Sequence, residues 1–290
     1  MVYAALIGDP VNHSVAPYLH EALARRLGLE FRYLKIKVEQ CELEDSLRAL
    51  QQLGFAGCNV TIPHKEEVAA HLDQVDEVSH SLGAVNTIVF GRSGSVGTNT
   101  DWRGIVDGLR HAGMPDENAN GKAVVFGSGG AARAAIFALK HLGYKTITLH
   151  YVTPADPKTM RLMGQADELG IVLLDYSSVE RTIEEANLVC NMTSTGMVGQ
   201  EPFPFPLMRL DPIDLSRKYF LDAVFNPIRT PLIEYFENRG AKSIDGIWMM
   251  LYQGIPAFEA WTGRKLTLTD SEVLDLHEML VREVVSLGHV

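Results

Sequence analysis

The fold of this chain is decided by the stretch Val124-Val125-Phe126-Gly127-Ser128-Gly129-Gly130-Ala131-Ala132-Arg133-Ala134. An apolar, β-branched run ends in glycines and continues into an alanine-rich segment, which predicts a strand, a tight turn and a helix. Gly127 permits the turn, and Gly129 lets the backbone approach a phosphate without an intervening Cβ atom. Unpaired backbone N–H groups at the start of the helix would face the same phosphate. The stretch therefore predicts a dinucleotide-binding unit, and the alternative is an ordinary strand-to-helix turn.

Length and composition narrow the class of protein. The 290 residues are 46% hydrophobic and 21% charged, which is typical of a globular chain with two domains. The net charge of −10 argues against nucleic acid or an anionic membrane as a partner. No apolar run reaches the roughly 18–20 residues that cross a bilayer, and the first residues lack the basic start of a secretory signal.

Cysteine and histidine usage points to an intracellular protein without a metal. Cys41, Cys58 and Cys190 have no pair spacing, which predicts reduced thiols and a cytoplasmic location. The ten histidines form no His-Glu-x-x-His motif and no Cys/His cluster. We therefore expect no metal site.

Strands that alternate with helices predict an α/β protein with mostly parallel sheets. We expect strands at 2–7, 31–38, 57–62, 83–89, 122–126, 146–150, 171–174, 188–191 and 220–224, a hairpin turn at 91–97, and helices at 17–26, 42–53, 105–111, 131–142, 160–169, 232–239 and 271–287. From 246 through 253 to 263 we expect a mainly helical segment. The chain must leave one sheet before the strand that begins at Lys122, so we expect a first domain over 1–103.

Eight stretches, the glycine stretch among them, occur in an informative order. They are Gly8-x-Pro10 with His13-Ser14-x-x-Pro17, Asn59-Val60-Thr61-x-Pro63-x-Lys65, Gly83-Ala84-Val85-Asn86-Thr87, Asn99-Thr100-Asp101-x-x-Gly104, the glycine stretch above, Asn191-x-Thr193-x-x-Gly196-Met197, Asp222-x-x-x-Asn226-Pro227-x-x-Thr230-Pro231, and Gln253 with Phe258-x-x-Trp261-Thr262-Gly263. Together they span residues 8–263 and resemble the shikimate dehydrogenase family.

The resemblance implies a fold and an activity. It implies an N-terminal α/β substrate domain over 1–103, a Rossmann domain over 104–242, and C-terminal helices over 243–290 that pack back on the first domain, with the substrate in the cleft between the domains. The implied enzyme is an NAD(P)-dependent oxidoreductase of aromatic amino acid biosynthesis, a monomer or homodimer, that interconverts 3-dehydroshikimate and shikimate. The cofactor-binding residues that it implies are Gly127, Gly129, Gly130, Ala131, Thr193 and Met197.

Lys65 and Asp101 are the candidate catalytic pair. Hydride addition to a ketone builds negative charge on oxygen, which requires a proton donor nearby. Both residues follow a strand end in a polar turn, where an ammonium could donate and a carboxylate could hold it. The resemblance assigns the pair this role. Taken alone, Lys65 would be a surface lysine and Asp101 the cap of the following helix.

The resemblance also implies substrate-binding residues, which are Ser14, Asn59, Thr61, Asn86 and Gln253. Each of these could instead satisfy local backbone groups. The family usually has a second serine where this chain has Ala16, and a tyrosine where it has Phe225. Two hydroxyls are therefore missing from the place where the family holds the substrate carboxylate. Quinate or a related cyclic hydroxy acid is consequently an alternative substrate.

Cofactor preference is open between NAD and NADP. An acidic residue after the second strand of the cofactor domain favours NAD, and a basic residue favours NADP. NADP-linked family members have Asn-Arg-Thr where this chain has Tyr151-Val152-Thr153. The candidates nearby are Asp156 for an NAD ribose and His150, Lys158 or Arg161 for a phosphate. The resemblance favours NADP slightly. A binding module without activity is a remote alternative, against which Lys65 and Asp101 argue.

Overall fold

The computed structural model describes residues 1–200 and 203–288. It divides into two compact units, one formed by Met1–Gly104 with the segment from Met250 onward, and the other by Ile105–Met249. Helices α4 (Asp101–His111) and α9 (Gly246–Thr262) carry the chain across these two divisions. The expected domain limits at 103/104 and 242/243 remain predictions. Each unit is described by itself.

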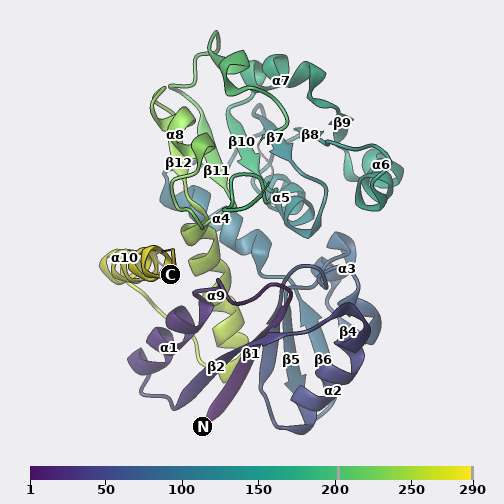
Figure 1. Cartoon of the computed structure of the whole chain (residues 1–290), viewed down its shortest axis with the longest axis vertical. Helices are drawn as coiled ribbons and strands as arrows, with labels where there is room; N and C mark the ends of the chain where they lie inside the picture. The colour runs from purple at the N-terminus through teal and green to yellow at the C-terminus, as the bar shows by residue number, and fades with distance from the viewer. Residues whose placement is uncertain (201–202, 289–290) are drawn as a thin grey trace. The chain divides into compact units, whose positions relative to one another are not determined.

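The first unit contains a six-stranded mixed sheet (Figure 1). Its strands are β1 (Val2–Gly8), β2 (Phe31–Lys37), β3 (Gly57–Val60), β4 (Gln74–Val75), β5 (Thr87–Gly91) and β6 (Gly94–Thr98), in the order β2-β1-β3-β5-β6-β4. Strand β5 is antiparallel to β3 and to β6, and the other pairs are parallel. The tight β5–β6 hairpin lies where the glycines at 91–97 predict it, and it needs no helical crossover of the kind that parallel strands require.

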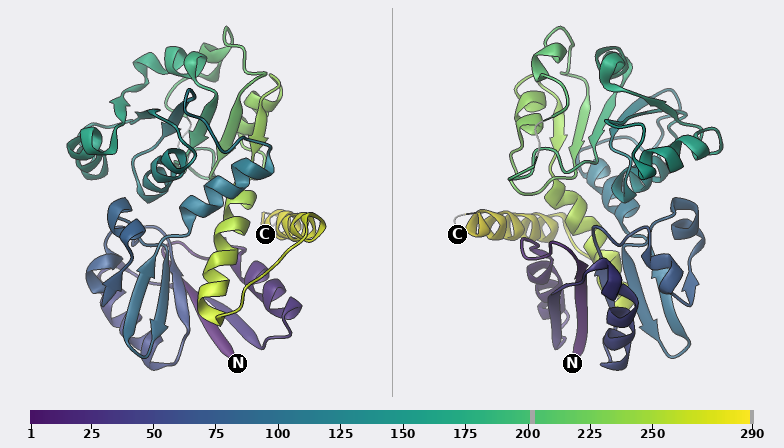
Figure 2. Two further views of the ribbon diagram at one scale, coloured as in Figure 1. Left: turned by 180° about the vertical axis from the view of Figure 1, so that it is seen from behind. Right: turned by 45° about the vertical axis from the view of Figure 1, so that its right-hand side comes forward.

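The first unit contains further helices in addition to the part of α9 from Met250 onward. They are α1 (Ala16–Arg26), α2 (Leu43–Gln52), α3 (Glu77–Leu82) and α10 (Asp270–Leu287), with the 3-10 turns η1 (Gln40–Glu42) and η2 (Val68–His71). Fully or nearly fully buried Ile7, Leu47, Val60 and Ile88 belong to one core cluster between the sheet and α2. The last helix, α10, lies beside α1 (Figure 2).

The strand expected at 83–89 begins only at Thr87. Helix α3 precedes it and was not expected. Asp76 caps this helix by accepting a hydrogen bond from Ser79 N, and Gly83 ends it in the left-handed conformation with φ 63°. Asp at the start and Gly at the end of a helix are ordinary capping signals. Six residues are too few to show a helical period in the sequence.

A close approach ties the end of the chain to this sheet. Trp261 Nε1 on α9 donates to Ile88 O at 2.9 Å. Gly57 lies at the same place, where a Cβ atom would overlap the Ile88 carbonyl oxygen and the Trp261 indole. Glycine is therefore required at 57 by space and not by its backbone angle.

The second unit contains an entirely parallel sheet (Figure 1). Its strands are β7 (Lys122–Phe126), β8 (Thr146–His150), β9 (Val172–Leu174), β10 (Leu188–Asn191), β11 (Tyr219–Asp222) and β12 (Lys242–Ile244), in the order β12-β11-β10-β7-β8-β9. This is the Rossmann strand order. All strands run in the same direction, and the order in which successive strands are added reverses between β7 and β10. The predicted fold class is confirmed.

Helices flank the parallel sheet. They are α5 (Gly130–His141), α6 (Pro157–Leu169), α7 (Val179–Glu185) and α8 (Pro231–Glu237), with the 3-10 turns η3 (Tyr176–Ser178) and η4 (Leu207–Leu210). Phe126, Ile183, Phe220 and Phe236 are fully buried in one core cluster that joins the strands to α7 and α8. Ligands of such sheets bind where the strand order reverses, outside the carboxyl ends of the strands. In this unit that point follows Phe126 and Asn191.

Candidate active site

The polar residues of the first unit gather at one edge of its sheet. The register pairs Asn59 with Thr87 and Thr87 with Thr98, so the carboxyl ends of β3 and β6 meet the amino end of β5. The chain continues from these ends into the turns that carry Lys65 and Asp101. Residues far apart in sequence are therefore brought to one edge by strand pairing.

Lys65 and Asp101 form an ion pair. Lys65 Nζ donates to Asp101 Oδ2 at 2.6 Å, and the exposed fractions of the two side chains are 20% and 6%. The Lys65 backbone is held because its carbonyl accepts from Val85 N at 2.8 Å. Asp101 is the first residue of α4, and its own N–H donates to Asn99 Oδ1 at 3.0 Å. The carboxylate is directed at the lysine rather than at the helix backbone.

Asn86 fixes the other oxygen of that carboxylate. Its Nδ2 donates to Asp101 Oδ1 at 2.8 Å and lies 3.2 Å from Gln253 Oε1. Its Oδ1 accepts from Thr100 N at 2.7 Å and from Thr87 Oγ1 at 2.9 Å. Because backbone and side-chain donors both meet Oδ1, the amide has a single orientation with its NH₂ group toward Asp101.

Asn59 lies beneath Asn86 and is 6% exposed. Its Nδ2 donates to Asn86 O at 3.2 Å and to Thr87 Oγ1 at 3.0 Å, while its Oδ1 accepts from Tyr33 Oη at 2.6 Å. Burial raises the pKa of Tyr33, so this phenol stays a donor at neutral pH. These contacts give Asn59 a supporting function under Asn86, and its direct contact with a substrate remains a prediction.

Sequence reasoning missed three residues of this network, Tyr33, Thr87 and Thr100. Thr87 and Thr100 stand inside motifs that were recognised, and the Thr100 hydroxyl lies 3.2 Å from Gln253 Oε1. Tyr33 belongs to an alternating strand and carries no motif. Its position opposite Asn59 depends on the pairing of β1 with both β2 and β3, which no local pattern reveals.

Ser14 and Thr61 are not hydrogen-bonded to this network within the described part of the chain. Ser14 is buried in the loop after β1, and its Oγ accepts from Ala16 N at 3.2 Å. Thr61 follows β3, and its N–H donates to Ile7 O at 2.9 Å. Hydrogen bonds thus link five of the predicted site residues to one another, namely Lys65, Asp101, Asn86, Gln253 and Asn59. The Ser14 and Thr61 hydroxyls are not part of this network.

The second unit carries the predicted phosphate turn. Gly127 has φ 112°, and a Cβ atom there would lie 2.9 Å from Met192 O and 3.1 Å from Thr193 Cγ2. At Gly129, a Cβ atom would have no neighbour within 4 Å among the described residues. Gly130 and Ala131 begin α5, whose first turn has no acidic residue. Together these features leave an open helix start without an acidic residue, which fits a pyrophosphate.

The other predicted cofactor residues follow β10. Thr193 is held because its N–H and hydroxyl both donate to Asn191 Oδ1, at 3.2 Å and 2.7 Å. Met197 N donates to Ser194 O at 3.1 Å, and Gly196 between them has φ 97°. This turn and the Gly127 turn follow the two neighbouring strands β10 and β7.

The end of β8 shows which groups could contact the ribose end of a dinucleotide. The Val152 side chain is 67% exposed. Asp156 caps α6 by accepting from Lys158 N at 3.0 Å, so part of its hydrogen-bonding capacity is used inside the protein. His150 is buried between Asp175 O and Thr182 Oγ1, at 2.7 Å from each, and burial lowers its pKa. A buried neutral imidazole is a poor partner for a phosphate.

Within residues 1–200 and 203–288, no group of three or more His, Cys, Asp or Glu side chains could hold a metal ion. No helix in the same part of the chain is long and apolar enough to cross a membrane.

A parallel six-stranded sheet with a glycine turn, together with a separate unit that carries a lysine–carboxylate pair, is the architecture of two-domain dinucleotide-linked oxidoreductases. Residues 6–88 match the family model described as the shikimate dehydrogenase substrate binding domain. A shikimate dehydrogenase (NADP(+)) of Rhodospirillum rubrum is 40% identical over 90% of this chain and 91% of its own length, and one of Roseobacter denitrificans is 36% identical over 92% and 95%. The chain belongs to the shikimate dehydrogenase family.

Solved structures support the same assignment. Shikimate 5-dehydrogenase from Thermus thermophilus, in complex with NADP(H) and shikimate, is 30% identical with a TM-score of 0.82, over 97% of this chain and all of its own. Quinate dehydrogenase from Corynebacterium glutamicum, in complex with NAD, is 28% identical with a TM-score of 0.82, over 97% and 99%. The fold is therefore shared by relatives with different substrates and cofactors, so substrate and cofactor must be argued from the site.

Proposed function

We propose that this chain is an NADP-dependent shikimate dehydrogenase that reversibly reduces 3-dehydroshikimate to shikimate. The observation that carries the proposal is the Lys65–Asp101 pair, with 2.6 Å between Nζ and Oδ2 and with Asn86 on the other carboxylate oxygen. Relatives that are 36–40% identical over most of the chain bear the name shikimate dehydrogenase (NADP(+)).

Each residue of the pair has a chemical function in this proposal. When bound, the nicotinamide supplies or accepts the hydride. The Lys65 ammonium donates a proton to the substrate oxygen as negative charge develops there, and it takes the proton back in the reverse direction. Asp101 holds the ammonium in place and compensates its charge. Asn86 holds Asp101 and, with Gln253, presents polar atoms to the hydroxyls of the ring.

The remaining predicted residues complete two binding sites. Ser14, Asn59 and Thr61 are assigned to the substrate. The residues assigned to the cofactor are Gly127, Gly129, Gly130, Ala131, Thr193 and Met197, and the open start of α5 supports the placement of the pyrophosphate there. NADP is preferred because the relatives at 36–40% identity bear that cofactor in their names.

A grid of turnover measurements tests the reaction. Wild-type protein is assayed with shikimate and with quinate, each with NAD and with NADP, and shikimate with NADP should give the highest kcat/KM. Lys65→Ala should lower kcat by about 10²–10⁴-fold, because the proton donor is lost. NADPH fluorescence should show unchanged cofactor binding in this variant. Near-normal turnover of Lys65→Ala, or a preference for quinate, would contradict the proposal.

We further propose that the enzyme works in the cytoplasm, as a monomer or homodimer. The three cysteines are free thiols, with Cys58 and Cys190 buried and Cys41 exposed, as suits a reducing compartment. Fractionation of cells that express the chain, followed by light scattering of the purified protein, tests both statements. Recovery from a membrane or secreted fraction, or a larger assembly, would contradict them.

A further inference from the structure

We propose that Lys35 determines specificity for an acidic substrate, because its ammonium lies beside Ser14 and supplies the positive charge that recognises the substrate carboxylate. The inference rests on the proposed function, since that function makes the substrate a cyclic carboxylic acid. It concerns the end of the substrate that Lys65 and Asp101 do not contact.

The position of Lys35 follows from its strand. On β2, Tyr33 and Lys35 are two residues apart and so face the same side of the sheet. Tyr33 meets Asn59 under the site, and Lys35 lies one step nearer the carboxyl end of the strand. Its Nζ donates to Asn12 O at 2.6 Å and lies 3.4 Å from Ser14 O. The ammonium is thus fixed against the loop that carries Ser14.

The charge of Lys35 is not neutralised by any carboxylate of the described residues, because its hydrogen-bond partners there are backbone carbonyls. By contrast, the Lys37 ammonium on the same strand lies 3.3 Å from Asp9 and 3.9 Å from Glu39. His13 in the same loop has its pKa lowered by burial and then by Lys35. This imidazole is therefore neutral at pH 7. The positive charge beside the loop comes from the Lys35 ammonium on β2.

The loop has the donors that a carboxylate needs. The Ser14 oxygen accepts from Ala16 N, so its hydroxyl hydrogen is available to donate to another group. Lys35 uses two of the three ammonium hydrogens on Asn12 O and Ser14 O, which leaves one. Position 16 is alanine and position 225 is phenylalanine, so neither offers a hydroxyl. One hydroxyl and one uncompensated cation can therefore replace a set of neutral hydroxyl donors.

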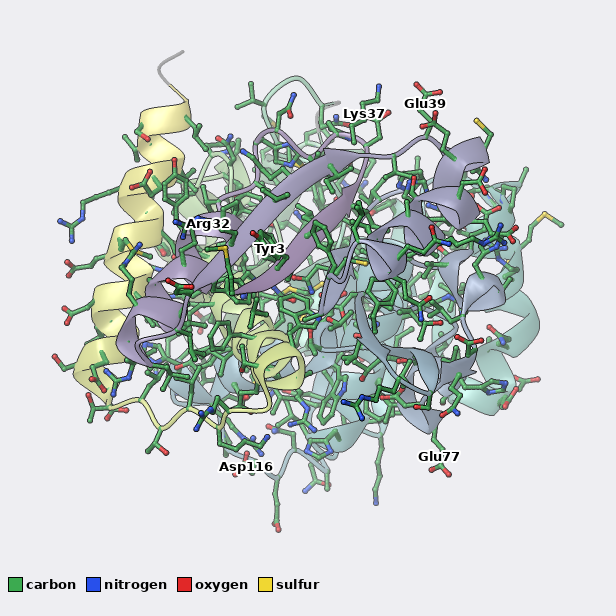
Figure 3. The ribbon with its side chains drawn as sticks, turned by 90° about the horizontal axis from the view of Figure 1, so that it is seen from below. Tyr3, Arg32, Lys37, Glu39, Glu77 and Asp116 are labelled. Carbon is green, nitrogen blue, oxygen red and sulfur yellow. The ribbon has the colours of Figure 1, made fainter. Side chains whose placement is uncertain are left out.

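Two matched variants isolate this charge. Lys35→Gln removes the charge and keeps an amide that can still donate to the loop carbonyls. Lys37→Gln makes the same change two residues further along the same strand, where the Lys37 and Glu39 side chains extend outward (Figure 3). Both variants and the wild type are titrated calorimetrically with shikimate and with shikimate methyl ester, which lacks the negative charge. Turnover of both compounds is measured in parallel, and thermal unfolding checks that each variant is folded.

Lys35→Gln should weaken shikimate binding and raise its KM by about 5–30-fold, as expected for a charge-assisted contact that is partly screened by solvent. Binding of the methyl ester, kcat for shikimate and all properties of Lys37→Gln should change by less than about 2-fold. In the wild type, shikimate affinity should fall with added salt, and this dependence should be weaker in Lys35→Gln. The salt titration of the wild type tests the proposal even if the variant does not fold.

Equal losses for shikimate and the methyl ester would overturn the proposal, since Lys35 would then only hold the loop. Unchanged shikimate affinity in Lys35→Gln, or wild-type affinity that does not depend on salt, would also overturn it. Wild-type protein that binds shikimate through Lys35 but does not oxidise it would refute the proposed function alone. Wild-type protein that binds no shikimate would refute both.

Discussion

The Lys65–Asp101 pair predicts unequal consequences when its two charges are removed one at a time. The carboxylate is more deeply buried than the ammonium, at 6% against 20% exposed. Lys65→Met leaves a buried negative charge without its cation, and among the described residues only Asn86 Nδ2 still donates to it. Asp101→Asn leaves an ammonium at the end of a long, flexible stem that can turn toward water.

The expected free energies follow from these contacts. Breaking a fully buried pair from one side costs about 3–5 kcal/mol, and the remaining Asn86 contact together with the partial exposure reduces this to about 2–3 kcal/mol for Lys65→Met. Asp101→Asn should cost about 1 kcal/mol, because the unpaired group regains solvent. The double variant should be about 1 kcal/mol more stable than Lys65→Met, since no buried charge is left.

Urea unfolding at pH 7 measures these free energies, and the same proteins are assayed for turnover. All three variants should lose kcat by about 10²–10⁴-fold, because the proton donor is absent or misplaced in each. Stability and activity should therefore rank the variants differently. The reasoning fails if Asp101→Asn is as unstable as Lys65→Met, or if the double variant is the least stable of the three.

Three other changes have defined outcomes. Val152→Arg should lower KM for NADP by about 10-fold relative to NAD in steady-state assays, because a guanidinium at this exposed position can pair with the 2′-phosphate; an unchanged ratio would place that phosphate elsewhere. Gly57→Ala should destabilise the protein by about 3 kcal/mol or more in urea, because its Cβ atom would overlap Ile88 O and Trp261; wild-type stability would exclude this close approach. Burial raises the pKa of Asp222 from 3.8 to about 6. The folded state therefore binds this proton more tightly than the unfolded chain, and the resulting stability, about 3 kcal/mol, is present below about pH 4 and lost as the pH rises through about 6. Asp222→Asn should lack this decline in urea unfolding between about pH 4 and pH 7, and parallel curves for the two proteins would refute the assignment.

The sequence predicts the second unit better than the first. The strands at Thr146–His150 and Leu188–Asn191 have the expected bounds. Parallel order follows from the regular alternation of strands and helices. Helix α7 (Val179–Glu185) was not expected, because seven residues make only about two turns and so show too few repeats of the helical period to recognise. In the first unit, β5 reverses direction through a hairpin, and the alternation rule does not apply there.

The sequence predicts which residues belong to the site, but it does not predict how their side chains are oriented or which hydrogen bonds they make. Motifs identified Lys65 and Asp101, and the structure brings their side chains together, while their catalytic roles remain a prediction. The direction of the Asn86 amide depends on Thr100 N and Thr87 Oγ1. The donor to Asn59 comes from Tyr33, on a strand two places away in the sheet. Such orientations require the register of the whole sheet, which the sequence does not state.

The first unit is built from two segments that are separated in the sequence by the second unit, and this has a consequence for synthesis on the ribosome. Its sheet is encoded before Gly104, yet Gln253 and Trp261 are encoded after the entire second unit. All residues of the second unit are therefore available to fold while the first unit still lacks the helix that Trp261 anchors to Ile88. A nascent chain that stops before this tryptophan contains all residues of the second unit and an incomplete first unit, a state that chaperones and proteases can recognise.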